Sequence, residues 1–134
     1  VEQRFRLSLR PVADIGGAVA EGYRLSRPAR PITGARSVAP LVRASDGSIV
    51  IETVKLADDG SGDLIVRLYE SQGRAASTTL TIDAEWRAAR RVDLLERDID
   101  GGELARAKGG GDAGAIALTM RPFEIATVRI LNAS

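Results

Sequence analysis

The side chains of this sequence that could carry out chemistry are carboxylates. Six of the 18 fall in two stretches, Asp58–Asp63 and Asp98–Glu103, and Glu70 and Glu96 lie between these stretches. The sequence contains neither histidine nor cysteine. This excludes histidine-assisted nucleophiles, thiolate metal sites and a disulfide framework. Cation binding by carboxylate oxygens is therefore the chemistry to consider first.

The run from Asp58 to Asp63 has the composition of a calcium-binding loop. It lacks the 12-residue register and the terminal bidentate glutamate of such a loop, so an acidic turn is the favoured interpretation. We predict a hairpin turn made by Asp58, Asp59, Gly60 and Gly62. Asp98–Glu103 could also hold a cation, but a solvated loop is favoured there. The glycine-rich Lys108–Gly111 is not a phosphate loop, because no strand-to-helix transition with Gly-Lys-Ser/Thr follows it.

Two apolar runs, Ile49–Val54 and Leu64–Tyr69, flank this turn and predict two paired strands. Alternation on the second strand sets an apolar face of Leu64, Val66 and Leu68, which we expect to face the core. The opposite face then carries Ile65, Arg67 and Tyr69. Strict alternation on the first strand would place Val50, Glu52 and Val54 opposite Ile51, Thr53 and Lys55.

The remaining chain predicts further short strands and at most one helix. We expect a helical segment within Val12–Leu25, an extended proline-rich connector over Ser26–Gly34, and a long polar loop over Glu96–Gly114. Further strands are expected at Arg4–Leu9, Val38–Val42, Ala75–Ile82, Ala89–Leu95, Ala115–Met120 and Ile125–Leu131. About eight short strands with frequent turns are typical of an all-β, antiparallel β-sandwich with Greek-key-like connections.

Length and composition predict a single domain over residues 1–134, with a leading strand and connector at 1–36 and the sandwich core at 37–134. The chain begins abruptly at Val1, as a piece of a longer polypeptide would, and a matured N-terminus is the alternative. The net charge is +1, which points to neither nucleic acid nor membrane, and no apolar run is long enough to span a bilayer. With 17 arginines among 19 basic residues, we expect a bacterial, cytoplasmic protein.

The mixed face of the predicted hairpin brings several charges close together, from Glu52 and Lys55 to Arg67 and Glu70. These charges could form an ordinary surface ladder of opposite charges, or the face could dock against a partner domain. Aromatic residues are few and not clustered, so the sequence shows no platform of rings for sugar binding.

Several motifs resemble the C-terminal region of the α-mannosidases of glycoside hydrolase family 38. The run Glu52–Leu64, continued by Val66–Glu70, carries the most specific match. Further motifs with the same order are Val92–Glu96, Arg121–Ile125, Thr127–Ile130 and Tyr23–Pro28, the last with Ser26 where asparagine is usual.

The resemblance implies a non-catalytic C-terminal domain of a retaining, zinc-dependent α-mannosidase. The zinc (or another divalent metal), the catalytic residues and the α-mannoside substrate would belong to an N-terminal catalytic domain of the same polypeptide. No catalytic or metal-binding residue is transferred to this chain. The domain would stabilise that catalytic domain and shape its substrate cleft. Our candidate interface residues are Glu52, Lys55, Arg67, Tyr69, Glu70, Arg121, Phe123 and Glu124. The alternative is an independent carbohydrate-binding module that uses Trp86 or Tyr69.

Overall fold

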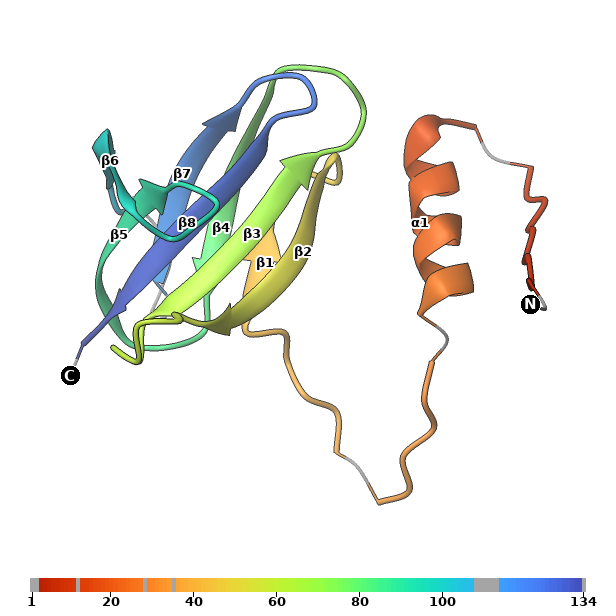
Figure 1. The fold of residues 1–134 in the computed structure, drawn as a ribbon, viewed down its shortest axis with the longest axis horizontal. Coiled ribbons are helices and arrows are strands. Elements are labelled where there is room, and N and C mark those ends of the chain that lie inside the picture. Colours follow the sequence, from red (N-terminus) through yellow and green to blue (C-terminus); the bar gives the residue numbers. More distant parts are fainter. Residues whose placement is uncertain (1–2, 12, 28, 35, 108–113, 134) are drawn as a thin grey trace. The chain divides into compact units, whose positions relative to one another are not determined.

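The computed structural model describes residues 3–11, 13–27, 29–34, 36–107 and 114–133, and within them eight strands form two antiparallel sheets (Figure 1). One sheet has five strands in the order β2-β3-β8-β5-β6, and the other has three in the order β1-β4-β7. The elements are α1 (Ile15–Ser26), β1 (Val42–Ala44), β2 (Ile49–Leu56), β3 (Leu64–Glu70), β4 (Ala76–Ile82), β5 (Trp86–Val92), β6 (Asp98–Leu104), β7 (Gly114–Met120) and β8 (Ile125–Asn132). The predicted antiparallel β-sandwich is confirmed.

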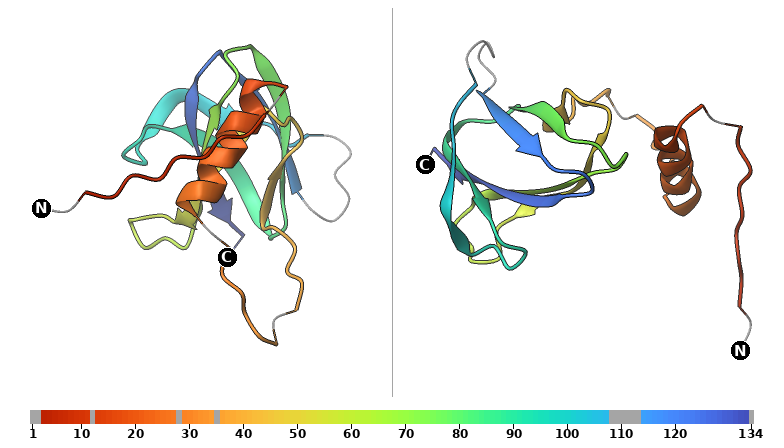
Figure 2. Two further views of the ribbon diagram at one scale, coloured as in Figure 1. Left: turned by 90° about the vertical axis from the view of Figure 1, so that its right-hand side faces the viewer. Right: turned by 90° about the horizontal axis from the view of Figure 1, so that it is seen from above.

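The chain divides into two units, Val1–Val38 and Ala39–Ser134, and all eight strands belong to the second. The views in Figure 2 show the two sheets of this unit as facing layers. The core between them is built from the inward side chains of both sheets. Its fully buried members include Leu68 of β3, Leu80 of β4 and Ile116 of β7. Burying these apolar side chains is the main favourable contribution to folding of this unit.

Alternation predicts the faces of β3 and β4 correctly. Val66 and Leu68 are buried in the core, and on β4 Thr78, Leu80 and Ile82 are buried whereas the intervening Ser and Thr side chains are partly or fully exposed. Ile65, on the other face of β3, is fully buried as well. Something other than solvent therefore covers part of the outer face of the five-stranded sheet.

The predicted faces of β2 are wrong beyond Ile51, because the pairing with β3 shifts at that point. Ile51 pairs with Leu68, but the next paired residue is Thr53, opposite Arg67, which marks a β-bulge at Glu52. One extra residue reverses the alternation. Val54 thus shares the face of Val66, whereas Thr53 and Lys55 lie with Arg67 and Ile65 on the outer face.

The first unit contains α1 in the region predicted to be helical. Asp14 caps it by accepting the Gly17 backbone N–H at 2.9 Å, and α1 buries none of its residues. The strand predicted at Arg4–Leu9 is wrong. Among the described residues nothing pairs with this segment, and Phe5, Leu7 and Leu9 are exposed. Alternation alone does not make a strand, because the backbone groups also need a neighbouring strand.

Two predictions near the other end of the chain also need correction. The strand expected at Ala89–Leu95 is β5, which ends at Val92, and residues 93–97 form a turn. The long loop expected over Glu96–Gly114 contains β6, which pairs with β5 through Asp98, Glu103 and Leu104. The triple glycine within that expected loop lies outside the described residues.

Candidate functional site

The outer face of the five-stranded sheet carries polar, aromatic and aliphatic side chains in register. Directly paired residues share a face in an antiparallel sheet. Across β3 and β8 the outer face therefore pairs Ile65 with Arg129, Arg67 with Thr127, and Tyr69 with Ile125. The first of these pairs lies near the β2–β3 turn, and the last lies near the turn that precedes β8.

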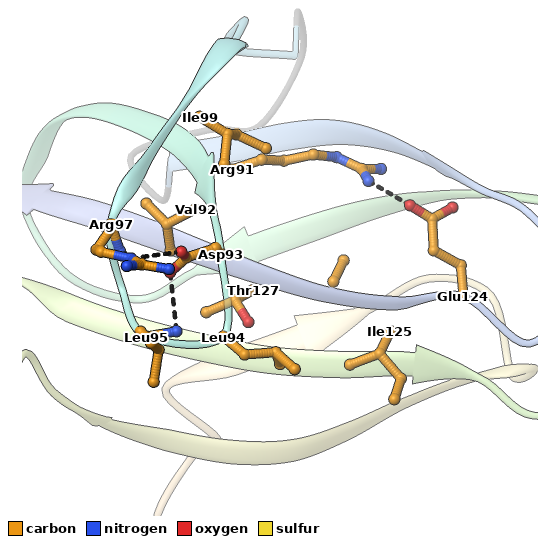
Figure 3. A pocket seen from close by; sticks show the side chains of 11 residues that line it. Arg91, Val92, Asp93, Leu94, Leu95, Arg97, Ile99, Glu124, Ile125 and Thr127 are labelled. Carbon is orange, nitrogen blue, oxygen red and sulfur yellow. Dashed lines mark hydrogen bonds and ion pairs between the residues drawn. The ribbon is translucent and has the colours of Figure 1, made fainter.

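The turn between β5 and β6 folds back over this outer face (Figure 3). Asp93 organises it, because one of its carboxylate oxygens accepts the backbone N–H groups of Leu95 at 2.8 Å and Arg97 at 2.9 Å. Arg67 Nη2 of β3 donates to the carbonyl oxygen of Leu94 at 3.1 Å. Glu96 forms an ion pair with Lys55 of β2. These contacts hold the turn across the sheet.

The ion pair of Lys55 with Glu96 joins the β5–β6 turn to the sheet near the start of the β2–β3 turn. Lys55 Nζ lies 2.6 Å from Asp58, and Glu96 Oε2 accepts the Asp58 backbone N–H at 2.9 Å. The hydrogen bonds of Lys55 to Asp58 and Glu96 raise the pKa of this lysine. The hydrogen bonds from Lys55 and the Asp58 N–H lower the pKa of Glu96. Both side chains are charged at neutral pH and fasten one turn to the other.

The acidic turn between β2 and β3 surrounds a guanidinium group. Arg129 of β8 donates from Nη2 to Asp59 at 2.6 Å and to Ser61 Oγ at 3.0 Å, and from Nε to Asp63 at 2.7 Å. Gly60 and Gly62 adopt φ values of 74° and 82°, as predicted for a turn rich in glycine. Hydrogen bonds from the Ser61 hydroxyl and N–H, with that from Arg129, lower the pKa of Asp59 to about 2. The cation held by this loop is therefore a side chain of the same domain.

Glu70 is fully buried at the end of β3 and joins two turns. Its carboxylate accepts the backbone N–H groups of Gln72 at 2.9 Å, Gly73 at 2.7 Å and Arg74 at 3.2 Å, and that of Phe123 at 3.1 Å. Burial by itself raises the pKa of Glu70, but these four N–H donors outweigh it and the net pKa is lowered. Glu70 is thus an ionised carboxylate whose observed contacts are backbone N–H groups.

Phe123, in the turn before β8, has a left-handed backbone with φ of 57°, which is unusual for a side chain of its size. Its ring lies against Gly73, where a Cβ atom would come within 2.6 Å of the ring. Next to it, Glu124 bonds Arg91 Nη1 at 2.6 Å and the Arg121 backbone N–H at 2.6 Å. The Phe123 ring nevertheless remains 68% exposed.

Two hollows lie side by side on this face and meet at Ile125. The larger, of about 460 Å³, is bounded by the β5–β6 turn and by Glu124, and Thr127 lies in its lining (Figure 3). The smaller, of about 310 Å³, is lined by Glu52, Arg67, Tyr69, Phe123 and neighbouring residues. We call these two hollows together the outer groove.

Residues 48–128 match the family described as the glycosyl hydrolases family 38 C-terminal beta sandwich domain, which is more than half of the chain. The chain belongs to this family. The resemblance stated from the motifs is thereby confirmed, and the matched residues of this family 38 domain include most of those that form the outer groove. No curated protein matches the chain.

The structure brings most of the predicted interface residues of the family 38 domain to one place. Five of the eight line the smaller hollow, namely Glu52, Arg67, Tyr69, Glu70 and Phe123. Glu124 lines the larger hollow. Lys55 lies apart beside the β2–β3 turn, and the exposed Arg121 lines neither hollow. Their role at an interface stays a prediction.

The turn that crosses the sheet and the residues of β8 beneath it were not predicted from the sequence. Leu94, Glu96 and Thr127 all contribute to this face, and although they lie in the motifs named above, none was among the predicted interface residues. The consecutive leucines Leu94 and Leu95 were a usable signal, because two adjacent large apolar residues break the alternation of a half-buried strand.

The aromatic residues considered for sugar binding lie on different sides of the sheet. Trp86 is buried in the core, with its ring against Gly114 and the Arg106 guanidinium 4.0 Å from the ring centroid. Tyr69 is half-buried on the outer face. The two rings therefore form no shared platform for a sugar.

The residues of this chain do not fit a zinc site of aspartate and histidine ligands, because its 134 residues include no histidine. In the described part of the chain, no three acidic side chains are grouped so that they could hold a metal ion. None of the helices formed by the described residues combines the length and apolarity of a membrane span.

Proposed function

We propose that this chain is the non-catalytic C-terminal domain of a retaining, zinc-dependent α-mannosidase. The observation that carries the proposal is the family 38 match over residues 48–128, together with the motifs that resemble the α-mannosidases of that family. In this proposal the catalytic residues, the zinc and the α-mannoside site belong to a catalytic domain elsewhere in the parent polypeptide. The present domain stabilises that catalytic domain and shapes the rim of its cleft.

The use of the carboxylates in this domain supports a structural role. A retaining glycosidase needs two carboxyl groups about 5 Å apart on either side of the scissile bond. Here the Glu70 carboxylate accepts hydrogen bonds from four backbone N–H groups. Asp63 accepts hydrogen bonds from Arg129 and from the Asn132 N–H. Glu124 accepts hydrogen bonds from Arg91 and from the Arg121 N–H in the turn before β8. Their observed partners are all within the domain, and these contacts organise turns.

The parent polypeptide that contains this chain tests the proposal. We expect it to hydrolyse nitrophenyl α-mannoside with retention of the anomeric configuration, and we expect a chelator to abolish turnover and zinc to restore it. The anomer of the first product, followed by NMR, is the measurement, and nitrophenyl β-mannoside and α-glucoside are the control substrates. Turnover of a control substrate in preference to the α-mannoside, or product of inverted configuration, would contradict the proposal.

A further inference from the structure

We propose that a hollow lined by arginines, near the C-terminal end of β8, binds a tetrahedral oxyanion such as phosphate or sulfate. The hollow has a volume of about 320 Å³ and shares no lining residue with the outer groove. We call it the arginine hollow. Six of the polar residues in its lining are Asp63, Arg87, Arg90, Asp98, Arg129 and Asn132. Binding of an oxyanion there is independent of the proposed α-mannosidase function.

The register of the sheet brings three arginines to this hollow. Arg90 of β5 is paired directly with Arg129 of β8, so two positive charges lie opposite each other on neighbouring strands. Arg87 is the extra residue where the pairing of β5 with β8 shifts, which marks a β-bulge, and its side chain is exposed. Like charges directly opposite each other are destabilising, and a bulge re-aims a side chain. Local arrangements that give up stability in this way are expected at functional sites.

The carboxylates of the arginine hollow are already engaged. Asp63 is only 6% exposed, and its two oxygens accept different donors. One accepts the Arg129 Nε–H at 2.7 Å, and the other accepts the Asn132 backbone N–H at 2.9 Å. Asp98 accepts a hydrogen bond from Arg90 Nη1 at 2.6 Å. A ligand that had to donate hydrogen bonds would therefore find few free acceptors in this hollow.

The unused polar groups of the hollow are donors. Within the described part of the chain, Arg87 bonds no other residue, and Arg90 uses only the N–H that reaches Asp98. The side-chain amide of Asn132 can also donate, and it has no hydrogen-bond partner in that part either. An arginine presents a planar fork of N–H donors that matches the oxygens of carboxylate and phosphate groups. The free donors therefore fit a ligand that offers several acceptor oxygens.

The charges around the hollow favour an anion over a cation or a neutral sugar. Its lining has two aspartates and three arginines, and each aspartate is paired with an arginine, so the charge of Arg87 is left over. Asp59 also bonds Arg129 but does not line the hollow. Glu103 is paired in register with Arg90 and does not line it either. The arginines would repel a divalent cation, and none of the described residues in the lining is an aromatic ring on which a sugar could stack.

Titration of the 134-residue chain with inorganic phosphate, followed by backbone amide NMR at constant ionic strength, tests this site. We expect saturable shifts confined to the arginine hollow, with a Kd on the order of 1 mM, the affinity of about two charge-assisted hydrogen bonds. Sulfate should bind comparably, and acetate more weakly, because it offers fewer oxygens to the two arginines. Methyl phosphate identifies the source of the anion. Binding as tight as that of phosphate indicates a phosphate ester, and weaker binding indicates the free anion.

Three variants assign the binding to particular side chains. Arg87→Gln should weaken phosphate binding roughly tenfold, because it removes the free guanidinium. Asp98→Asn should tighten binding roughly threefold, because it releases Arg90 from its ion pair and removes a negative charge. The matched control is Arg43→Gln, which changes the net charge as Arg87→Gln does. Arg43 is exposed on β1 of the other sheet and bonds no other described residue, so its replacement should leave the Kd unchanged.

Four outcomes would overturn the inference. Shifts that spread over the surface without saturating would show that phosphate has no site, and equal weakening by Arg87→Gln and Arg43→Gln would show a general effect of charge. Weaker binding by Asp98→Asn would mean that the ligand needs a carboxylate acceptor, which an oxyanion does not. Saturable binding of mannose in place of phosphate would identify a sugar site. Because the titration needs no turnover, each of these results is distinguishable from failure of the proposed α-mannosidase activity.

Discussion

At the scale of single residues, the acidic side chains of this domain act as acceptors that organise its turns. Glu70 gathers four N–H groups from two turns, and Asp93 closes the turn between β5 and β6. Asp59 and Asp63 hold the Arg129 guanidinium. By residue type alone, these carboxylates could take part in chemistry. In the structure, however, they bind N–H groups and arginine side chains of the same chain. This use of the carboxylates fits the supporting role proposed for the domain.

Replacing Glu70 by glutamine tests this role. An amide cannot serve the four N–H donors as a carboxylate does, so we expect Glu70→Gln to lower the melting temperature on the order of 5–10 °C at pH 7. The control is Glu103→Gln on the exposed edge strand β6, which we expect to leave the melting temperature nearly unchanged. Equal effects of the two substitutions would contradict the assignment.

The same pair of proteins has a predictable pH dependence. The pKa of Glu70 in the folded protein lies below its ordinary value of 4.5. The stability that its carboxylate contributes is therefore fully present above about pH 4.5 and is lost as the pH falls through the lower, folded-state pKa. The difference in melting temperature between wild type and Glu70→Gln should shrink in acid. A difference that grows as the pH falls would be inconsistent with an ionised Glu70.

Gly73 is a second residue whose identity the structure requires. Its φ is 75°, and a Cβ atom would approach the Phe123 ring to 2.6 Å. We expect Gly73→Ala to destabilise the domain by about 1–3 kcal/mol. Gly47→Ala is the matched control, because nothing lies within 4 Å of a Cβ atom there and its φ is not in the left-handed region. Chemical denaturation of both variants is the measurement, and equal midpoints would refute this explanation.

The Asp59 carboxylate should titrate with a pKa of about 2 in an NMR pH titration. We expect Ser61→Ala and Arg129→Gln each to move this pKa upward toward the ordinary value of 3.8, because each removes a hydrogen bond to the ionised carboxylate. A pKa near 3.8 in the wild-type domain would show that the turn does not enclose the guanidinium in solution.

At the scale of elements, β3 has one face in the core and the other beneath the crossing turn. Leu68 is fully buried, so we expect Leu68→Ala to cost on the order of 2–5 kcal/mol, because it leaves a cavity. Lys55 lies on the outer face of β2 and is partly exposed. We therefore expect Lys55→Ala to lower the free energy of unfolding much less than Leu68→Ala does. Denaturant unfolding of the two variants gives the comparison, and the reverse order would mean that the two faces are exchanged.

The sequence predicts those strands that have one face in the apolar core and the other face in more polar surroundings. Alternation locates β3 and β4 and their core faces because one side of each strand packs in the core. Alternation does not locate β6, because most residues of this edge strand are exposed on both faces. Its sequence therefore shows no alternation of apolar and polar residues. Alternation also fails at Arg4–Leu9, where the period of two is present without a pairing strand.

The candidate site was predictable only in part, for a related reason. The charged residues of the hairpin and of the turn before β8 were identified because each motif is local in sequence. The β-bulge at Glu52 and the crossing turn at Leu94 depend on contacts between distant segments, such as Arg67 with Leu94 and Lys55 with Glu96. Local patterns do not report such contacts, so the shape of the outer groove could be obtained only from the structure.

At the scale of the whole molecule, the domain has a well-packed core between its sheets, and its carboxylates are committed to turns. Its outer groove is bordered by exposed apolar residues such as Leu94, Phe123 and Ile125. Membership in family 38 and the use of the carboxylates are the observations on which the proposed role as a supporting domain rests.

The most direct test of this view is turnover by the 134-residue chain itself. Release of nitrophenol from nitrophenyl α-mannoside should be measured with the purified chain in the presence of zinc, with buffer containing zinc as the blank. We predict a rate equal to that of the blank. Zinc-dependent release that rises in proportion to the concentration of the chain, and that a chelator removes, would contradict the account.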